Sequence, residues 1–456
     1  MAEVTARKRI WGWMMFDWAT QPFYTLLLTF IFGPYLVGVV ADLFVANGQE
    51  AESAKAQAQT YWSNGQVFIG LIIAATAPVL GAFADTTGRR MPWMYGFSVL
   101  YVVSTFALWW MVPDGSAILL CFIAFGVAMV TVEYMQVFIN AMLPSLGRDD
   151  EIGAISGSGF ALGYAGGVIA LFIMLLFFAE SGDGKTFVGF DPAFGLSAET
   201  REGTRSVGPI TAIWFLVFIA PFFLWVKDTR STEPTGTFRD SLSDLWASLS
   251  AVLKIPSLFA YLTSSMFYRD ALNAIYIYGG VYALLVLDWD ITTRGIFGII
   301  AAISAGIFSW LGGRADRVFG PKPVILANVW VLIVVVTVIV SMSREALFGI
   351  QLAEGSKLPD YLMFTLGAVI GGAGGALQSA SRTMMARHTD PDRPTEAFGL
   401  YAFSGKATAF LAPGLIGFFT YLTDSPRYGL FPIIFLFIIA LILLRWVNPE
   451  GNREHA

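Results

Sequence analysis

The first long apolar run, Trp11 to Ala41, limits the fold most strongly, because it is long enough to cross a bilayer yet carries the carboxylate of Asp17. A helix needs about 20 residues to cross the hydrocarbon core of a membrane. A charged side chain inside a membrane helix is costly and rarely faces lipid, so it marks an interior site or an ion path. The run therefore predicts a membrane helix with Asp17 directed into the protein.

Comparable apolar runs recur along the whole chain. The chain has 456 residues, of which 56% are hydrophobic and 13% charged, a balance that a soluble fold of this length does not carry on its surface. At about 20 residues per span, the runs predict an all-α membrane protein with about twelve transmembrane helices. The expected helices cover residues 13–41, 61–83, 92–112, 117–142, 152–179, 208–226, 257–284, 293–313, 322–342, 359–386, 397–422 and 429–446.

Basic residues indicate the orientation of the chain. An even number of spans puts both termini on one side, and the connections on that side, such as Arg89 to Arg90, Lys227 to Lys254 and Arg314 to Lys322, hold most of the Lys and Arg. The positive-inside rule then places both termini in the cytoplasm. The first run is too long for a signal-peptide core, so we expect a retained helix. Short loops favour a bacterial inner membrane.

The longest inner connection divides the sequence into halves. We expect an N-terminal bundle over residues 1–226, a cytoplasmic linker over 227–256 and a C-terminal bundle over 257–456. Apolar residues recur in the linker every three or four positions, which predicts an amphipathic helix lying along the membrane surface. These apolar residues are Phe238, Leu242, Leu245, Trp246, Leu249 and Val252.

Composition also argues against several kinds of function. The net charge is −5, so no basic face for nucleic acid is expected. Cys121 is the only cysteine, and the two histidines, His388 and His455, fall in a predicted loop and in the tail. The chain therefore has few Cys and His residues that could bind a metal or act in nucleophilic catalysis. We expect no cofactor, no metal and no enzymatic activity.

One loop motif appears at corresponding points of the two halves. After the second helix Gly81 is followed by Asp85, Gly88, Arg89 and Arg90, and after the eighth helix Gly312 is followed by Asp316, Arg317 and Gly320. A glycine permits close helix approach, and an aspartate can accept hydrogen bonds from a neighbouring helix N-terminus or an arginine. The motif therefore predicts a conformational latch made of Gly81, Asp85, Gly88, Arg89, Arg90, Asp316 and Arg317.

These motifs resemble those of a known family. The Gly81 to Arg90 loop resembles the signature between helices two and three of the major facilitator superfamily. Other stretches look like its vacuole-effluxer branch, which includes the autophagy-related vacuolar amino-acid permeases and bacterial relatives. They are Phe16 to Ala19, Gly159 to Gly167, Tyr268 to Asp270, Gly371 to Arg382, Glu396 to Lys406 and Ala412 to Gly414. The resemblance implies the major facilitator fold, an all-α fold with twelve transmembrane helices in two pseudo-symmetric six-helix bundles. It also implies transport by alternating access and a central cavity lined by helices one, four, seven and ten.

The ionisable residues within the spans fall on those helices and one neighbour. They are Asp17, Glu133, Arg269, Asp270, Arg382 and Lys406. The carboxylates of Asp17, Glu133 and Asp270 are candidates for proton uptake, because burial favours their neutral form. Arg382 can grip a carboxylate with two N–H groups, and Lys406 offers a second cation. This set suits a zwitterionic amino acid or a related small carboxylate, moved by a secondary active transporter that is coupled to protons.

Polar neighbours extend the candidate site. Glu133, Gln136 and Asn140 share one helical face, as Arg269 and Asn273 do. Gln378 and Tyr401 lie on the same helices as the later charges. We expect Gln136, Asn140, Asn273, Gln378 and Tyr401 to contribute to substrate binding or proton coupling. Pro22, one turn after Asp17, frees a backbone carbonyl, so an unwound first helix is expected there.

Alternative readings stay open. The charges can instead form internal ion pairs that hold helices together, for example Glu133 with Arg382 or Asp17 with Lys406, or can reach outward from helix ends. The stretch Gly88 to Trp93 also resembles the loop of cation-coupled sugar or glycoside symporters. A membrane receptor without transport activity is the alternative of a different class. The expected partners are a small-molecule substrate, H⁺ (or Na⁺) and the lipid bilayer, and the expected state is a monomer.

Overall fold

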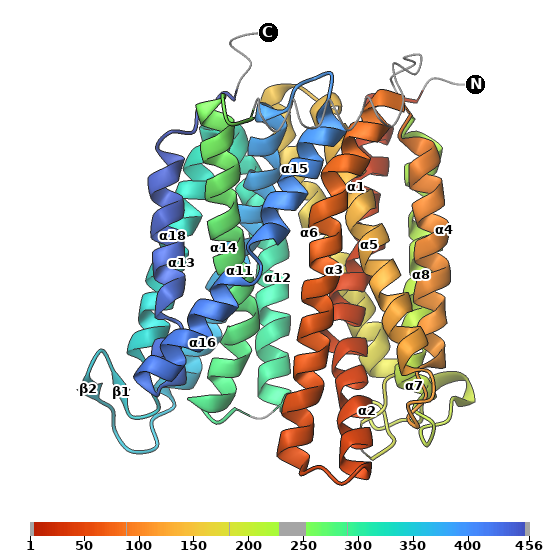
Figure 1. The fold of residues 1–456 in the computed structure, drawn as a ribbon, viewed down its shortest axis with the longest axis vertical. Coiled ribbons are helices and arrows are strands. Elements are labelled where there is room, and N and C mark those ends of the chain that lie inside the picture. Colours follow the sequence, from red (N-terminus) through yellow and green to blue (C-terminus); the bar gives the residue numbers. More distant parts are fainter. Residues whose placement is uncertain (1–3, 88, 182, 228–251, 290, 452–456) are drawn as a thin grey trace. The chain divides into compact units, whose positions relative to one another are not determined.

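The computed structural model describes residues 4–87, 89–181, 183–227, 252–289 and 291–451, and most of them are helical (Figure 1). The predicted amphipathic helix lies outside the described residues except for Val252. The helices of the first half are α1 (Ala6–Pro22), η1 (Phe23–Phe30), α2 (Phe32–Ala46), α3 (Ala51–Thr87), α4 (Met91–Ala107), η2 (Leu108–Trp110), α5 (Ile118–Met142), η3 (Leu143–Ser145), α6 (Asp149–Phe177), η4 (Ala193–Gly195), α7 (Glu202–Arg205), α8 (Val207–Phe218) and α9 (Ala220–Trp225).

The second half is also helical except for one small hairpin. Strands β1 (Ala346–Leu347) and β2 (Ile350–Gln351) pair antiparallel after the helix α13, and Figure 1 shows this hairpin beyond the helix end. The helices are α11 (Pro256–Leu285), α12 (Ile291–Phe319), α13 (Pro321–Ser341), α14 (Leu358–His388), α15 (Pro394–Ala407), α16 (Leu411–Thr423), α17 (Pro426–Gly429) and α18 (Phe431–Leu444).

Eleven segments of the described chain are long and apolar enough to cross a membrane. They correspond to all the expected spans except the seventh, which is α11. Its 30 residues suffice for a crossing, but Arg269, Asp270 and several hydroxyl side chains lower its hydropathy. The expected span that fails the hydropathy criterion is therefore α11, which carries the candidate functional residues Arg269 and Asp270.

Contacts between Cα atoms group the chain into two compact units. Unit 1 contains Met1–Ile73, Arg89–Ile139 and Leu162–Ser231, and unit 2 contains Ala74–Gly88, Asn140–Ala161 and Thr232–Ala456. Unit 2 therefore includes one end each of α3, α5 and α6 together with the helices of the second half. The division of the chain at residues 227–256 into two bundles stays a prediction.

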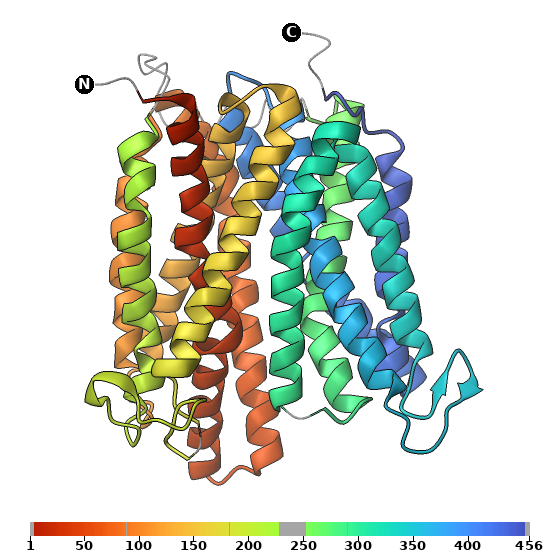
Figure 2. The ribbon, with the colours of Figure 1, turned by 180° about the vertical axis from the view of Figure 1, so that it is seen from behind.

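Unit 1 is held together largely by aromatic side chains. Phe125 on α5 stacks on Phe23 and Phe32 at ring-centroid distances of 5.6 and 6.0 Å. Trp18 on α1 stacks on Trp214 of α8 at 5.6 Å, and the Trp214 indole N–H donates to the Trp18 carbonyl. Such rings bury large apolar areas and fix helix register through their shape. Figure 2 shows α1 beside the α8 and α9 segment in this unit.

Two membrane helices are interrupted near proline. Pro22 ends α1, and the chain continues as the π-helix η1 before a bend at Ile31. The expected unwinding after Pro22 is therefore not found. The backbone stays helical with wider turns, because proline lacks the N–H that a regular turn needs. The predicted helix 397–422 is split into α15 and α16. Pro413 explains the split, since its ring conflicts with the carbonyl of the residue four positions earlier.

Candidate functional site

In unit 1 two of the predicted carboxylates lie around one phenol. Tyr24, in the π-helix η1, has Glu133 of α5 within side-chain hydrogen-bonding reach and also lies in the electrostatic field of Asp17. Asp17 is 7% exposed and lies against Gly163 of α6. Wide turns of this kind occur mostly as local bulges at functional sites. Asp17 and Glu133 therefore both act on a phenol that belongs to a distorted helix.

In unit 2 Arg382 is buried and surrounded by protein atoms. Its side chain on α14 is 2% exposed. Nε donates to the Ser156 hydroxyl at 2.9 Å, Nη2 donates to the Ser156 carbonyl at 2.7 Å, and Nη1 reaches Asn140 Oδ1 at 3.5 Å. The guanidinium also lies 4.1 Å from the centre of the Phe160 ring. Arg382 therefore does not reach outward from a helix end, and it joins α14 to α5 and α6.

Arg269 is more accessible than Arg382. It is half-buried on α11, and its guanidinium lies 4.2 Å from the centre of the Tyr401 ring. Nη1 donates to the Tyr401 carbonyl at 2.9 Å. Gly405 on α15 gives the guanidinium room, because a side chain at that position would occupy the same space. One described hydrogen bond leaves other N–H groups of Arg269 for a ligand.

Asp270 lies at the break between α15 and α16. Its side chain is 3% exposed, and Oδ2 accepts a hydrogen bond from the backbone N–H of Ala412 at 2.9 Å. Ala412 is the second residue of α16, so the carboxylate caps the positive end of this half-helix. In transporters, discontinuous helices often mark the sites of substrates and coupling ions. Asp270 is therefore a charged group placed where the helix is interrupted.

The motif aspartates of the two halves both lie beside helix N-termini within unit 2. Asp85 Oδ2 accepts a hydrogen bond from the N–H of Glu396, in the first turn of α15, at 2.8 Å. Gly81 lies against the Thr395 carbonyl. Asp316, which is 1% exposed, lies against Gly153 near the start of α6. Asp85 thus accepts a hydrogen bond from a helix N-terminus, whereas neither carboxylate oxygen of Asp316 has a described hydrogen-bond partner. The latch role stays a prediction.

The remaining latch residues differ in position. Arg317 is exposed and forms an ion pair with Asp150 at 3.7 Å. Arg89 is exposed and Arg90 is half-buried, while Gly88 lies outside the described residues. Exposed ion pairs contribute little to stability. The aspartates and Gly81 are thus the part of the motif with buried contacts.

The polar companions are not all in one place. Asn140 lies beside Arg382 and is 8% exposed, and Tyr401 lies beneath Arg269 and is 8% exposed. Asn273 is exposed, while Gln136, Gln378 and Lys406 are half-buried. The structure groups Asn140 with Arg382 and Tyr401 with Arg269. It does not group Asn273 with either arginine through a described hydrogen bond.

Sequence reasoning missed several polar partners in unit 2. Ser156 accepts from Arg382 and donates to the Ser379 carbonyl at 3.0 Å. Tyr261 and Tyr268 both donate toward Ser381, to its carbonyl and its hydroxyl. Ser156 lies between glycines in the sequence, and Tyr261 and Tyr268 lie in an apolar run. Neither pattern has a distinctive spacing. Only their position opposite α14 reveals them.

Two kinds of predicted placement are wrong. Asp85 and Asp316, expected in loops, lie in the last turns of α3 and α12, because these helices continue beyond their apolar runs. His388, expected in a loop, is the last residue of α14 and is 3% exposed. Its ring stacks on Tyr261 at 5.4 Å, and Nε2 shares a hydrogen bond with Ser257 at 2.8 Å. The predicted helix ended at residue 386, because the polar residues after it resemble a loop. Tertiary packing extends the last turn by covering the histidine.

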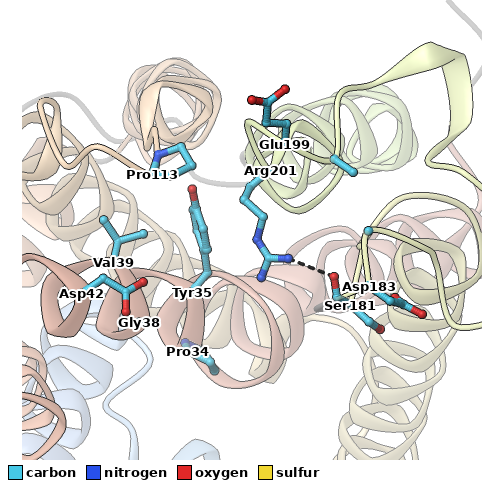
Figure 3. A pocket seen from close by; sticks show the side chains of 12 residues that line it. Pro34, Tyr35, Gly38, Val39, Asp42, Pro113, Ser181, Asp183, Glu199 and Arg201 are labelled. Atoms are coloured by element: carbon cyan, nitrogen blue, oxygen red, sulfur yellow. Dashed lines mark hydrogen bonds between the residues drawn. The ribbon is translucent and has the colours of Figure 1, made fainter. Parts of the chain in front are cut away.

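A separate cavity of about 650 Å³ lies among the loops of unit 1 (Figure 3). Its wall includes Tyr35, Asp42, Asp183, Glu199 and Arg201. Arg201 donates to the Ser181 carbonyl at 3.2 Å, as Figure 3 shows. None of the predicted site residues lines this cavity. It belongs to the loop end of the unit and not to the buried charges.

Below this cavity a buried carboxylate fixes the long loop of unit 1. Glu180, whose side chain is fully buried, accepts from the Thr204 N–H at 2.9 Å and lies 3.8 Å from the guanidinium of Arg201. Arg205 donates to the Trp109 carbonyl and lies over its ring. These contacts tie the loop to α7 and η2.

Known structures share the fold. The chain superposes on the Escherichia coli fucose:proton symporter FucP with a TM-score of 0.67 at 12% identity, covering 96% of this chain and 97% of that one. It superposes on the proton:xylose symporter XylE with a TM-score of 0.71 at 10% identity, covering 99% and 98%. At such low identity the similarity shows the major facilitator fold alone.

Similarity in sequence identifies the family. The chain is 23% identical over 451 residues to the uncharacterized MFS-type transporter YxiO of Bacillus subtilis, covering 97% of this chain and 95% of the relative. It is 22% identical over 311 residues to the autophagy-related protein 22 of Cryptococcus neoformans, covering 66% of this chain and 51% of that protein. A model of the family described as "Vacuole effluxer Atg22 like" matches residues 5–456. With the fold, the buried charges and this match together, the chain belongs to the vacuole effluxer Atg22-like family of major facilitator transporters.

Proposed function

We propose that this transporter moves an amino acid or a related small carboxylate by alternating access, with protons as the coupling ion. The observation that carries the proposal is the meeting of Asp17 and Glu133 around Tyr24, beside the π-helix η1. We assign proton coupling to these two carboxylates because both act on the same buried phenol. A proton-binding pair beside a distorted helix is a suitable coupling element.

The proposed substrate class is supported by the charges of the candidate residues. An amino acid needs an anionic partner for its amino group and a cationic partner for its carboxylate. The carboxylates Asp17 and Glu133 are of the kind that suits an amino group. Considered by itself, Arg269 has a half-buried guanidinium that keeps N–H groups for a carboxylate. We place the carboxylate contact at Arg269 in preference to Arg382. The reason is that Arg382 already donates to Ser156 and Asn140 and would have to break these bonds.

Tyr401 adds a further element to the Arg269 site. Its ring lies under the guanidinium and holds it by a cation–π contact. This contact orients the planar fork without using all of its hydrogen-bond donors. A carboxylate could then bind with two parallel hydrogen bonds, a geometry that lysine cannot reproduce.

The test is uptake into proteoliposomes. Radiolabelled leucine and tyrosine should enter with an imposed pH gradient, and Glu133→Gln should abolish the gradient dependence while solute exchange at equal pH persists. Arg269→Lys should weaken amino-acid uptake more than Lys357→Gln, which changes an exposed cation before α14. Gradient-driven uptake that Glu133→Gln leaves unchanged would remove this carboxylate from the mechanism.

The same assay separates the alternatives. A sugar or glycoside symporter would accumulate a labelled disaccharide and ignore leucine, and its uptake would not depend on Arg269. A Na⁺-coupled carrier would respond to a sodium gradient at constant pH. A receptor would exchange no solute under any of these conditions. The inner-membrane location, the cytoplasmic termini and the monomeric state belong to this proposal as well.

A further inference from the structure

A groove at the start of α1 combines cations with a mostly apolar wall. Its volume is about 470 Å³, within the roughly 300–1,000 Å³ typical of small-ligand sites. It is lined by residues of the first helix and of α9: Thr5, Arg7, Lys8, Trp11, Met15, Pro221 and Trp225. The whole groove belongs to unit 1. None of the buried charges assigned to transport takes part in it.

The two cations of the groove lie at the N-terminus of a helix, where the helix dipole disfavours positive charge. Arg7 and Lys8 are exposed and belong to the first turn of α1, which contains no acidic residue. The N-terminus of a helix carries a partial positive charge, so cations there are unfavourable unless an anion is near. Among the described residues, neither side chain forms an ion pair or a hydrogen bond. Charge complementarity therefore favours an anionic occupant.

The position of the tryptophans indicates the depth of the groove. Trp11 lies near the start of the first span, and Trp225 is the last residue of the span Glu202–Trp225. Tryptophan at the ends of membrane spans sits at the level of lipid headgroups. Trp11 is 45% exposed, so its ring is available for contact. The groove thus lies where headgroups and the first acyl carbons meet.

Close packing of two helices builds the wall. Gly12 lets α1 approach α9, since a side chain there would meet the Pro221 carbonyl oxygen at 2.9 Å. The aromatic and thioether side chains of Trp11, Met15 and Trp225 then form an apolar surface that leads away from the cations. A free phosphate would use only the cations and leave this surface uncovered. A lipid uses both.

We propose that this groove binds the headgroup and upper acyl chain of an anionic phospholipid. Arg7 and Lys8 donate to the phosphate, and Trp11, Met15, Pro221 and Trp225 pack against the chain. Basic pockets between membrane helices bind anionic headgroups in this way. The site is independent of the transported solute, so it stands apart from the proposed function.

The test uses native mass spectrometry of the full chain in detergent. Dioleoyl phosphatidylglycerol should form adducts in preference to dioleoyl phosphatidylcholine. The double variant Arg7→Gln/Lys8→Gln should lower this preference by roughly 25-fold, at about five-fold per cation near the surface. The single variant Arg7→Gln should lower the preference by roughly five-fold. Its control is Arg445→Gln, which removes an exposed arginine beside the exposed Trp446 outside the groove and should leave the preference unchanged.

Two further arms identify the occupant. Trp225→Ala should weaken phosphatidylglycerol binding, because it removes part of the acyl wall. Inorganic phosphate should not displace the lipid. Equal binding of the two lipids, an unchanged preference in the double variant, or displacement by inorganic phosphate would each overturn the proposal.

Discussion

The carboxylate of Asp85 accepts a hydrogen bond from the backbone N–H of Glu396, 311 residues later in the chain, over 2.8 Å. Glu396 lies in the first turn of α15, where backbone N–H groups have no partner within the helix. The charge on Asp85 also faces the positive end of that helix. Asp85, near the C-terminal end of α3, thus holds a helix of the second half within one compact unit.

Removing this acceptor should open the contact. Asp85→Ala leaves the Glu396 N–H without its charged partner, at a cost of about 1.5–3 kcal/mol for a hydrogen bond to a charged group. We expect Ala397→Cys, in a Cys121→Ser background, to react with a maleimide roughly 10-fold faster or more when Asp85 is replaced. Glu354→Ala, which removes an exposed carboxylate before α14, is the control. An unchanged labelling rate would show that Asp85 does not restrain α15.

Ser156 should be important for folding although it carries no charge. Ser156→Ala removes the hydroxyl that accepts from Arg382 Nε and leaves a buried donor unsatisfied. The expected loss of stability is about 1–3 kcal/mol, measured by thermal unfolding in detergent. Ser116→Ala, in an exposed loop, should have a smaller effect. Equal melting temperatures for the two variants would mean that water or another group satisfies Arg382.

Asp270 should hold the half-helix α16 through its carboxylate oxygen. Asp270→Ala removes the cap of the Ala412 N–H, at a cost of about 0.5–2 kcal/mol. Asp270→Asn keeps an oxygen acceptor and loses only the charge. Hydrogen exchange at the start of α16 should therefore increase in the alanine variant and much less in the asparagine variant. Equal exchange in both variants would show that the charge, and not the hydrogen bond, fixes this helix.

Gly405 should control the position of Arg269. Gly405→Leu places a side chain where the guanidinium lies and forces it away from the Tyr401 ring. If Arg269 binds the carboxylate of the solute, the apparent KM for amino-acid uptake should rise about 10-fold or more, the value of one charge-assisted hydrogen bond. Gly417→Leu is the matched control, because an added Cβ there meets no atom within 4 Å. An unaltered KM would separate Arg269 from substrate binding.

Glu180 should stabilise the loop end of unit 1. Its buried carboxylate accepts from Thr204 and faces the partly exposed Arg201. Glu180→Ala is expected to cost about 1–3 kcal/mol and to increase proteolysis within residues 183–201. The comparison is Asp183→Ala, an exposed carboxylate of the same loop. Identical proteolysis of the two variants would show that the loop is held by other contacts.

Composition and periodicity were sufficient for the membrane class, and the resemblance of short motifs was sufficient for the family. Apolar runs of span length predict membrane helices because the bilayer accepts little else, and eleven of these segments are found in the described chain. The repeated glycine–aspartate motif and the second-half motifs identified the superfamily, which the family match confirms. Local rules also located the irregular part of the first helix at Pro22, but they predicted an unwound segment where the structure has a π-helix.

Tertiary structure decided which charged and polar groups meet. The sequence placed Arg382 on a helix of the expected cavity, but only packing shows that it is 2% exposed and bonded to Ser156, 226 residues away. Likewise nothing near Asp85 in the sequence names Glu396 as its partner, and nothing near His388 indicates its burial against Tyr261. A sequence pattern fixes which face of a helix a residue occupies. The neighbour on that face depends on helix register and crossing angle, which arise from contacts far apart along the chain.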